Sequence, residues 1–217
     1  MTRITVAILV MALSPVGNIR GQDAGKPAVS REAVEEVIAN AKKGDKVDVA
    51  EVKPGRINMS GTGFVVRVQG PLNRVDSYSR ERLKQYLPIH FDSIPAAMID
   101  STVLIEATPL KEVSAINNCA QVVTPPATHI VAAITVDGTI QIVQPLSKKT
   151  FTVSVKSNSD LAKQCKNMLV VPSFTATGIS AVFPPSVMSG QTLEIRVITE
   201  SKEFAYKVDP KQRVLVR

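Results

Sequence analysis

The chain has 217 residues, which is enough for one sizeable domain or two small ones. It contains no Trp and only six Phe and three Tyr, so platforms for stacking sugars or bases are scarce and the core must be mostly aliphatic. The formal net charge of +7 favours acidic surfaces, such as anionic lipid headgroups or envelope polymers. The scarcity of aromatic side chains argues against a nucleic-acid partner.

The first 21 residues predict a secretory signal peptide. Arg3 precedes an apolar run over residues 4–13, about half the length that a membrane-spanning helix needs. Pro15 then interrupts the run, and the small residue Gly21 marks the expected cleavage point. We therefore expect an exported protein, periplasmic or secreted, without a transmembrane anchor.

The next segment predicts an amphipathic helix. A lead-in over residues 22–29 is followed by Ser30, a good N-cap, and Gly44 closes the segment. Four apolar residues between these ends recur at helical spacing: Val34, Val37, Ile38 and Ala41. This apolar stripe predicts that residues 22–44 pack on the domain that follows.

From residue 45 onward the apolar period changes to two, which is typical of half-buried strands. Asp137 and Gly138 lie between two of these runs and predict a tight hairpin turn. One short helix is expected over residues 77–87, ended by Pro88. The strand runs cover residues 47–52, 64–69, 102–107, 129–136, 139–143, 151–156, 174–183, 193–198, 204–208 and 214–216.

These patterns predict a mainly β fold: a two-layer antiparallel β-sandwich-like domain with an N-terminal helix and one short inserted helix. We expect a single domain over residues 45–217, with a division near residues 109–112 as the alternative. The chain lacks the tryptophan that immunoglobulin domains carry between their paired cysteines, so only the architecture is indicated.

The cysteine content predicts one disulfide and no metal site. Cys119 and Cys165 are the two cysteines of the chain, and such a pair in an exported protein is more often bridged than free. Closing this long loop would restrict the unfolded chain by roughly 4 kcal/mol. The two histidines, His90 and His129, are not spaced with the cysteines as in a zinc signature, so neither a metal nor another cofactor is expected.

The sequence offers few candidates for catalysis. His90 and Asp92 follow the short helix in an expected loop and are the best pair for a hydrolase, whereas His129 falls in a strand pattern. Residues 178–182 begin like a nucleophile elbow but carry Val182 in place of the second glycine. Residues 58–60 fit the acceptor pattern for N-glycosylation.

Five basic residues are candidates for an anion-binding patch. They fall close together in the sequence and would meet if they shared a face; the alternative is a solvated face with Glu81 interleaved. They are Arg67, Arg74, Arg80, Arg82 and Lys84.

Together these features favour an exported, non-catalytic binding or interaction module. Its expected partner is another envelope or extracellular protein, or an anionic surface, contacted through strand edges and loops. Two alternatives remain open: a secreted hydrolase using His90 and Asp92, and a carrier that holds an apolar ligand between the two layers.

Overall fold

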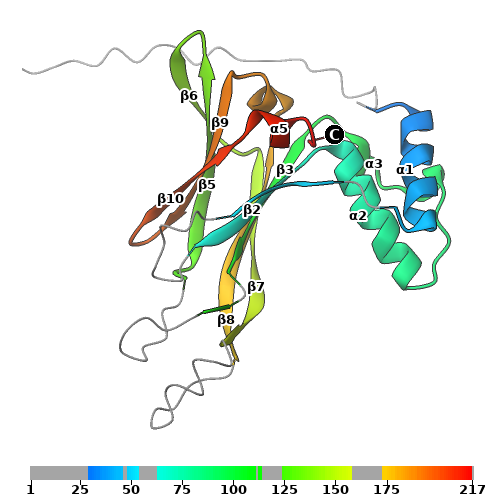
Figure 1. Cartoon of the computed structure of the whole chain (residues 1–217), viewed down its shortest axis with the longest axis horizontal. Helices are drawn as coiled ribbons and strands as arrows, with labels where there is room; N and C mark the ends of the chain where they lie inside the picture. Colours follow the sequence, from blue (N-terminus) through cyan, green and yellow to red (C-terminus); the bar gives the residue numbers. More distant parts are fainter. Residues whose placement is uncertain are drawn as a thin grey trace, which may run out of the picture.

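The structure is a computed structural model, and it describes residues 29–45, 48–53, 63–110, 112–113, 124–157 and 173–216 (Figure 1). The expected signal peptide, Cys119, Cys165 and the acceptor motif at residues 58–60 lie outside these residues. Of the described helices, none is long and apolar enough to span a bilayer.

The described strands form two sheets, which confirms the mainly β, two-layer prediction. The first sheet has the order β1 (Ala50–Val52), β2 (Phe64–Gln69), β3 (Val103–Pro109), β8 (Ser173–Phe183), β7 (Ser147–Ser157) and β4 (Glu112–Val113). The second has the order β10 (Glu203–Val208), β9 (Thr192–Thr199), β5 (Ala127–Val136) and β6 (Thr139–Val143). All pairs are antiparallel except β4 with β7.

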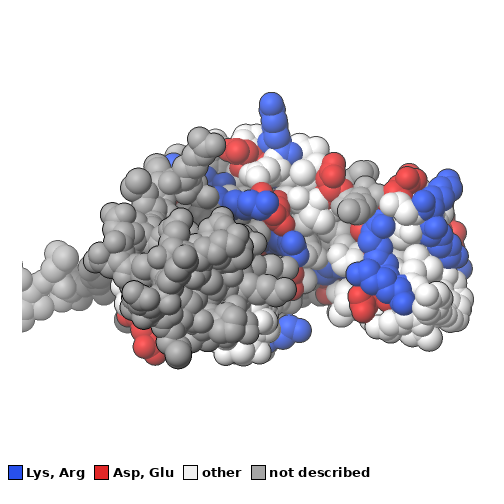
Figure 2. Space-filling model, turned by 60° about the horizontal axis from the view of Figure 1, so that its bottom comes forward, with Lys and Arg blue, Asp and Glu red and all other residues white. Residues whose placement is uncertain are grey.

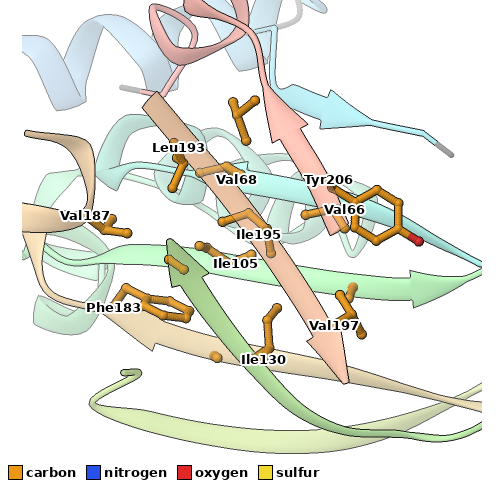
Figure 3. Packing of buried hydrophobic residues seen from close by; sticks show 14 of the residues in the cluster. Val66, Val68, Ile105, Ile130, Phe183, Val187, Leu193, Ile195, Val197 and Tyr206 are labelled. Carbon is orange, nitrogen blue, oxygen red and sulfur yellow. The ribbon is translucent and has the colours of Figure 1, made fainter. Parts of the chain in front are cut away.

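The main core lies between the two sheets, because alternate side chains of each strand point inward. Figure 3 shows Val66, Ile105 and Phe183 of the six-stranded sheet facing Ile130 and Ile195 of the other. All five are fully buried. Burying each aliphatic side chain of this size contributes about 1.5–3 kcal/mol, so the interface between the sheets dominates the stability of the fold.

The N-terminal helix α1 (Arg31–Lys43) begins and ends as its sequence predicts. The Ala33 amide donates a hydrogen bond to Ser30 Oγ at 3.2 Å, and Gly44 ends the helix in the left-handed region at φ 88°. Its buried residues pack against α2 (Pro71–Lys84) and form a second apolar cluster, which includes Val34, Val75 and Ile94. The helices therefore share a core of their own beside the sandwich (Figure 1).

The inserted helix α2 starts six residues before the expected helix. Gly70 is its N-cap and its amide donates to Asn73 Oδ1 at 3.0 Å, while Pro71 occupies the first turn. The connection back to β3 also holds a 3₁₀ turn η1 (Phe91–Ser93) and a short helix α3 (Ala96–Ile99). The first turn of α2 is polar in sequence, and hydrogen bonds to other segments satisfy those polar side chains in the fold.

The chain between β5 and β6 forms the expected hairpin. Asp137 and Gly138 have φ angles of 50° and 75°, and Val136 pairs with Thr139 across the turn. Two successive positive φ angles are what a two-residue turn of the primed type requires.

The prediction of a strand at residues 214–216 is wrong. These residues follow a short helix, α5 (Pro210–Arg213), and their amides donate to carbonyls three or four residues earlier. Pro210 presets the first helical turn, and Gln212 Oε1 accepts from the Asp209 amide at 3.0 Å. Local capping therefore overrides the apolar alternation of the last residues. A 3₁₀ turn η2 (Pro185–Met188) connects β8 to β9.

Candidate functional site

His90 and Asp92 are exposed in the loop that carries them. His90 precedes η1, its carbonyl accepts from Ser93 Oγ at 2.6 Å, and its amide donates to the same hydroxyl at 3.1 Å. Asp92 faces away toward Arg31, with Oδ1 at 3.9 Å from the guanidinium. The described pockets are lined by other residues. These contacts are a 3₁₀ cap and a surface ion pair, and among the described residues neither is a contact between His90 and a nucleophilic side chain.

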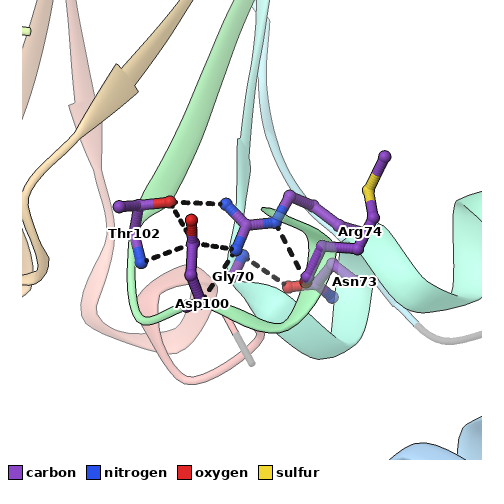
Figure 4. Close-up of polar contacts among 6 residues, drawn as sticks. Gly70, Asn73, Arg74, Asp100 and Thr102 are labelled. Atoms are coloured by element: carbon purple, nitrogen blue, oxygen red, sulfur yellow. Dashed lines mark hydrogen bonds and ion pairs between the residues drawn. The ribbon is translucent and has the colours of Figure 1, made fainter. Parts of the chain in front are cut away.

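Arg74 is buried and belongs to a structural network instead of a surface patch (Figure 4). Its Nη2 donates to the carboxylate and to the carbonyl of Asp100, both at 2.8 Å, and its Nη1 donates to Thr102 Oγ1 at 3.0 Å. Nε adds a bond to the Met98 carbonyl at 3.3 Å. The guanidinium group thus joins α2 to the segment between α3 and β3. Because most of its N–H donors are used in these bonds, few remain to bind an external anion.

The other four basic residues also have contacts within the chain. Arg67 Nε lies 2.8 Å from Glu51 and lowers the pKa of that carboxyl group, chiefly by hydrogen bonding. Arg80 pairs with Asp76 at 2.9 Å, a hydrogen bond that raises the pKa of the guanidinium. Arg82 donates to the Pro88 carbonyl, and Lys84 lies 3.7 Å from Glu81. On the face that Figure 2 shows, Asp and Glu side chains lie among the Lys and Arg side chains of the helical part.

Gly178, the first residue of the elbow-like segment, has a packing role inside β8. Strand pairing places it opposite Phe151 of β7. A Cβ atom at this position would lie 2.6 Å from Phe151 Cζ and 2.7 Å from the Ala107 carbonyl oxygen. Residues 178–182 are therefore continuous strand, and the glycine admits the Phe151 ring.

The edge strand β6 exposes apolar side chains. Ile140 is 64 % exposed and Ile142 is 48 % exposed, and Leu146, just after the strand, is 65 % exposed. Both isoleucines lie on the outer face of their sheet, opposite Thr135 and Ala133 of β5. Next to Ile140, that face is hollowed by a pocket of about 380 Å³, which extends across β9 to Lys207.

A second hollow lies on the outer face of the six-stranded sheet. It has a volume of about 460 Å³ and is bounded by α3, β3, β8 and β7. We call it the β3–β7 groove; its lining includes Leu104, Glu106, Lys149, Ser180 and Val182. Sequence reasoning missed these residues, because they are far apart in the chain and only the strand register brings them together.

The described residues contain no cluster of three or more His, Cys, Asp or Glu side chains that could hold a metal ion. His129 is an exposed strand residue opposite Ile198.

In comparisons of the chain with protein-family models, with curated proteins and with solved structures, none matched.

Proposed function

We propose that this protein is a non-catalytic binding protein that takes up an extended, apolar segment of another protein as an added strand beside β6. The observation that carries this proposal is the composition of β6. Its five residues bear no charge, and Ile140 and Ile142 are exposed on it. An exposed apolar edge strand is a template for pairing with another chain.

Two of the other described edges show the contrast. At the opposite edge of the same sheet, β10 carries Glu203 and Lys207, and β1 at the edge of the larger sheet carries Glu51. Charged side chains on an edge hinder pairing with a foreign strand, because the new strand would have to desolvate them. Only at β6, of these three edges, is this protection missing.

The backbone of β6 offers its hydrogen-bonding groups at two residues. A two-residue turn closes on a hydrogen-bonded pair, here Val136 and Thr139, and such pairs then alternate with non-bonded pairs along an antiparallel ladder. Ile140 and Ile142 fall at the non-bonded positions. Their N–H and C=O groups therefore point away from β5, toward the open edge.

An extended segment of another protein suits this edge better than a second copy of the chain. A stable interface between two folded surfaces uses about 20 to 30 residues a side, many more than the five residues of β6. An added strand needs only the backbone ladder and pockets for alternate side chains. The hollow beside Ile140, lined by apolar and charged side chains, lies on the face to which every second side chain of the added strand would point.

The signal-peptide pattern of residues 1–21 supports the further proposal that the protein is exported, with Cys119 and Cys165 bridged. Its partner would then be an envelope or extracellular protein. The space between the sheets is filled by core side chains, and the described hollows lie on outer faces, which favours surface binding over an internal apolar ligand.

The test uses the protein as bait against the envelope and secreted fractions of its host, with two lysine variants. Ile142→Lys places a charge on the β6 edge, and Ala205→Lys places the same charge on the outer face of β10. A captured protein should be lost with the first variant and kept with the second. On rebinding, hydrogen exchange should slow at the Ile140 and Ile142 amides, whereas the Gln141 amide is already protected in the free protein.

Two results would overturn the proposal. One is a captured protein that binds Ile142→Lys as well as it binds the unaltered chain. The other is a concentration-dependent homodimer protected at the same two amides, which would make a second copy the occupant of the edge.

A further inference from the structure

The β3–β7 groove combines an apolar floor with charged side chains, of which Arg74 and Asp100 pair with each other and Lys148 donates to the Thr128 carbonyl at 3.3 Å. Leu104 on β3 and Val182 on β8 are register partners and form part of the floor. In the next row of the sheet, Glu106, Ser180 and Lys149 lie side by side on β3, β8 and β7. The row therefore places a carboxylate, a hydroxyl and an ammonium group along one line across the groove.

Ser180 is the central residue of that row. Only 4 % of its surface is exposed, and its side chain lines the groove. Within the described part of the chain, the Ser180 hydroxyl has no hydrogen-bond partner. The buried side-chain atoms without a partner among the described residues are Asp76 Oδ1, Ser79 Oγ and Arg82 Nε, so the Ser180 hydroxyl is open to the groove. A ligand in the groove can therefore reach it and accept its hydrogen bond.

The two charged groups of that row retain unused bonding capacity. Glu106 accepts one hydrogen bond, from Gln69 Nε2 at 3.3 Å, and its register neighbour Arg67 is engaged by Glu51. Among the described residues Lys149 has no ion pair. β3 and β7 are two strand spacings apart, roughly 10 Å, which leaves room for a group of a few atoms between the charges.

The wall of the groove near α3 is fixed by the Arg74 network. Arg74 bonds to Asp100 and Thr102, and all three residues line the groove (Figure 4). Because the Arg74 donors are engaged within the protein, we assign this end a positioning role. The volume of about 460 Å³ falls in the range of small-molecule sites.

We propose that the β3–β7 groove binds a small zwitterion with an apolar side chain, of the size of an amino acid or dipeptide. The ammonium group of the ligand lies at Glu106, its carboxylate lies at Lys149, and Ser180 donates to that carboxylate. The apolar side chain rests on Leu104 and Val182. This site is independent of the β6 edge, which belongs to the other sheet.

The test measures binding of three probes by titration calorimetry: leucyl-leucine, its N-acetyl form, which lacks the ammonium group, and its C-terminal amide, which lacks the carboxylate. Each charged contact, once lost, should weaken binding at least about tenfold. Glu106→Gln should weaken leucyl-leucine and the amide without affecting the N-acetyl form. Lys149→Met should weaken leucyl-leucine and the N-acetyl form without affecting the amide.

Control variants carry the same changes outside the groove, at the exposed pair Glu81→Gln and Lys84→Met. They should bind all three probes like the unaltered chain. Ser180→Ala should weaken every probe that keeps its carboxylate. The proposal is overturned if leucyl-leucine shows no binding at millimolar concentration to the folded protein, or if groove and control variants bind it equally.

Discussion

The hydroxyl oxygen of Tyr206 on β10 accepts a hydrogen bond from the backbone amide of Phe64 on β2, at 2.7 Å. This contact joins the two sheets, and both residues are buried in the core between them. The ring of Phe64 also meets Phe204 edge to face, with centroids 5.4 Å apart. The hydrogen bond between the two sheets therefore lies beside a pair of packed aromatic rings.

We expect Tyr206→Phe to destabilise the protein by about 1–3 kcal/mol, because it leaves the Phe64 amide buried without an acceptor. Urea unfolding followed by circular dichroism measures the change. Tyr86→Phe is the matched control, since Tyr86 is 96 % exposed and should shift stability very little. Equal effects of the two variants would contradict the role given to Tyr206.

Tyr206 should also make stability depend on pH at the alkaline end. Burial raises the pKa of Tyr206 to about 12, against an ordinary value near 10 in the unfolded chain. The neutral hydroxyl is favoured in the folded state, so its contribution is full below pH 10. It should fall between pH 10 and 12 by up to about 1.4 kcal/mol per pH unit. The stability difference between the unaltered chain and Tyr206→Phe, measured from pH 8 to 11, should shrink above pH 10; a constant difference would refute this prediction.

Arg74 and Arg67 should differ sharply in their contribution to stability. Arg74→Met should cost about 2–4 kcal/mol, because Arg74 is buried and its removal leaves Asp100, Thr102 and two carbonyls without their donor. Arg67→Met breaks a partly exposed pair with Glu51 and should cost less than about 1 kcal/mol. Denaturant midpoints of the two variants check this order, and a reversed order would show that the network at Arg74 is not stabilising.

Gly178→Ala should destabilise the strand pair of β7 and β8 by about 1–3 kcal/mol, since its Cβ would overlap Phe151 and the Ala107 carbonyl. The comparison is Gly138→Ala in the hairpin turn, where space is open and only the positive φ of 75° opposes the change. The double variant Gly178→Ala with Phe151→Ala should cost less than the sum of its parts, because one of the two clashes is gone. Strict additivity of the two changes would argue against the contact with the ring.

The proposed export has a direct readout in intact mass. Protein recovered from its native host should lack about the first 21 residues and should take up a thiol-alkylating label only after reduction. The control sample is labelled without reduction. A full-length chain with both thiols accessible would refute export and the bridge between Cys119 and Cys165.

Local signals in the sequence predicted local structure well. Ser30 and Gly44 mark the ends of α1, and Asp137 with Gly138 makes the turn between β5 and β6. In each case the interaction that fixes the structure joins residues at most a few positions apart, so the local sequence is enough to predict the helix end or the turn.

Contacts between segments that are far apart in the chain could not be predicted from the sequence. The helix was expected to start at residue 77, and its true first turn was missed because its polar residues Asn73 and Arg74 have their partners on other segments, at Asp48 and Asp100. The β3–β7 groove was not predicted either, since Glu106, Ser180 and Lys149 become neighbours only through the pairing of three strands. A period-two pattern predicts which face of the sheet a residue occupies, but it does not predict which residue of the next strand lies beside it.

The row that contains the groove residues extends further across the sheet, from Glu51 through Arg67, Glu106 and Ser180 to Lys149. The apolar alternation of the inner face does not by itself distinguish this alignment, because sliding one strand by two residues keeps apolar side chains inward. The same slide would remove Arg67 from its place between two carboxylates. The outer-face charges therefore add a modest preference for the native alignment of the strands over an alignment shifted by two residues.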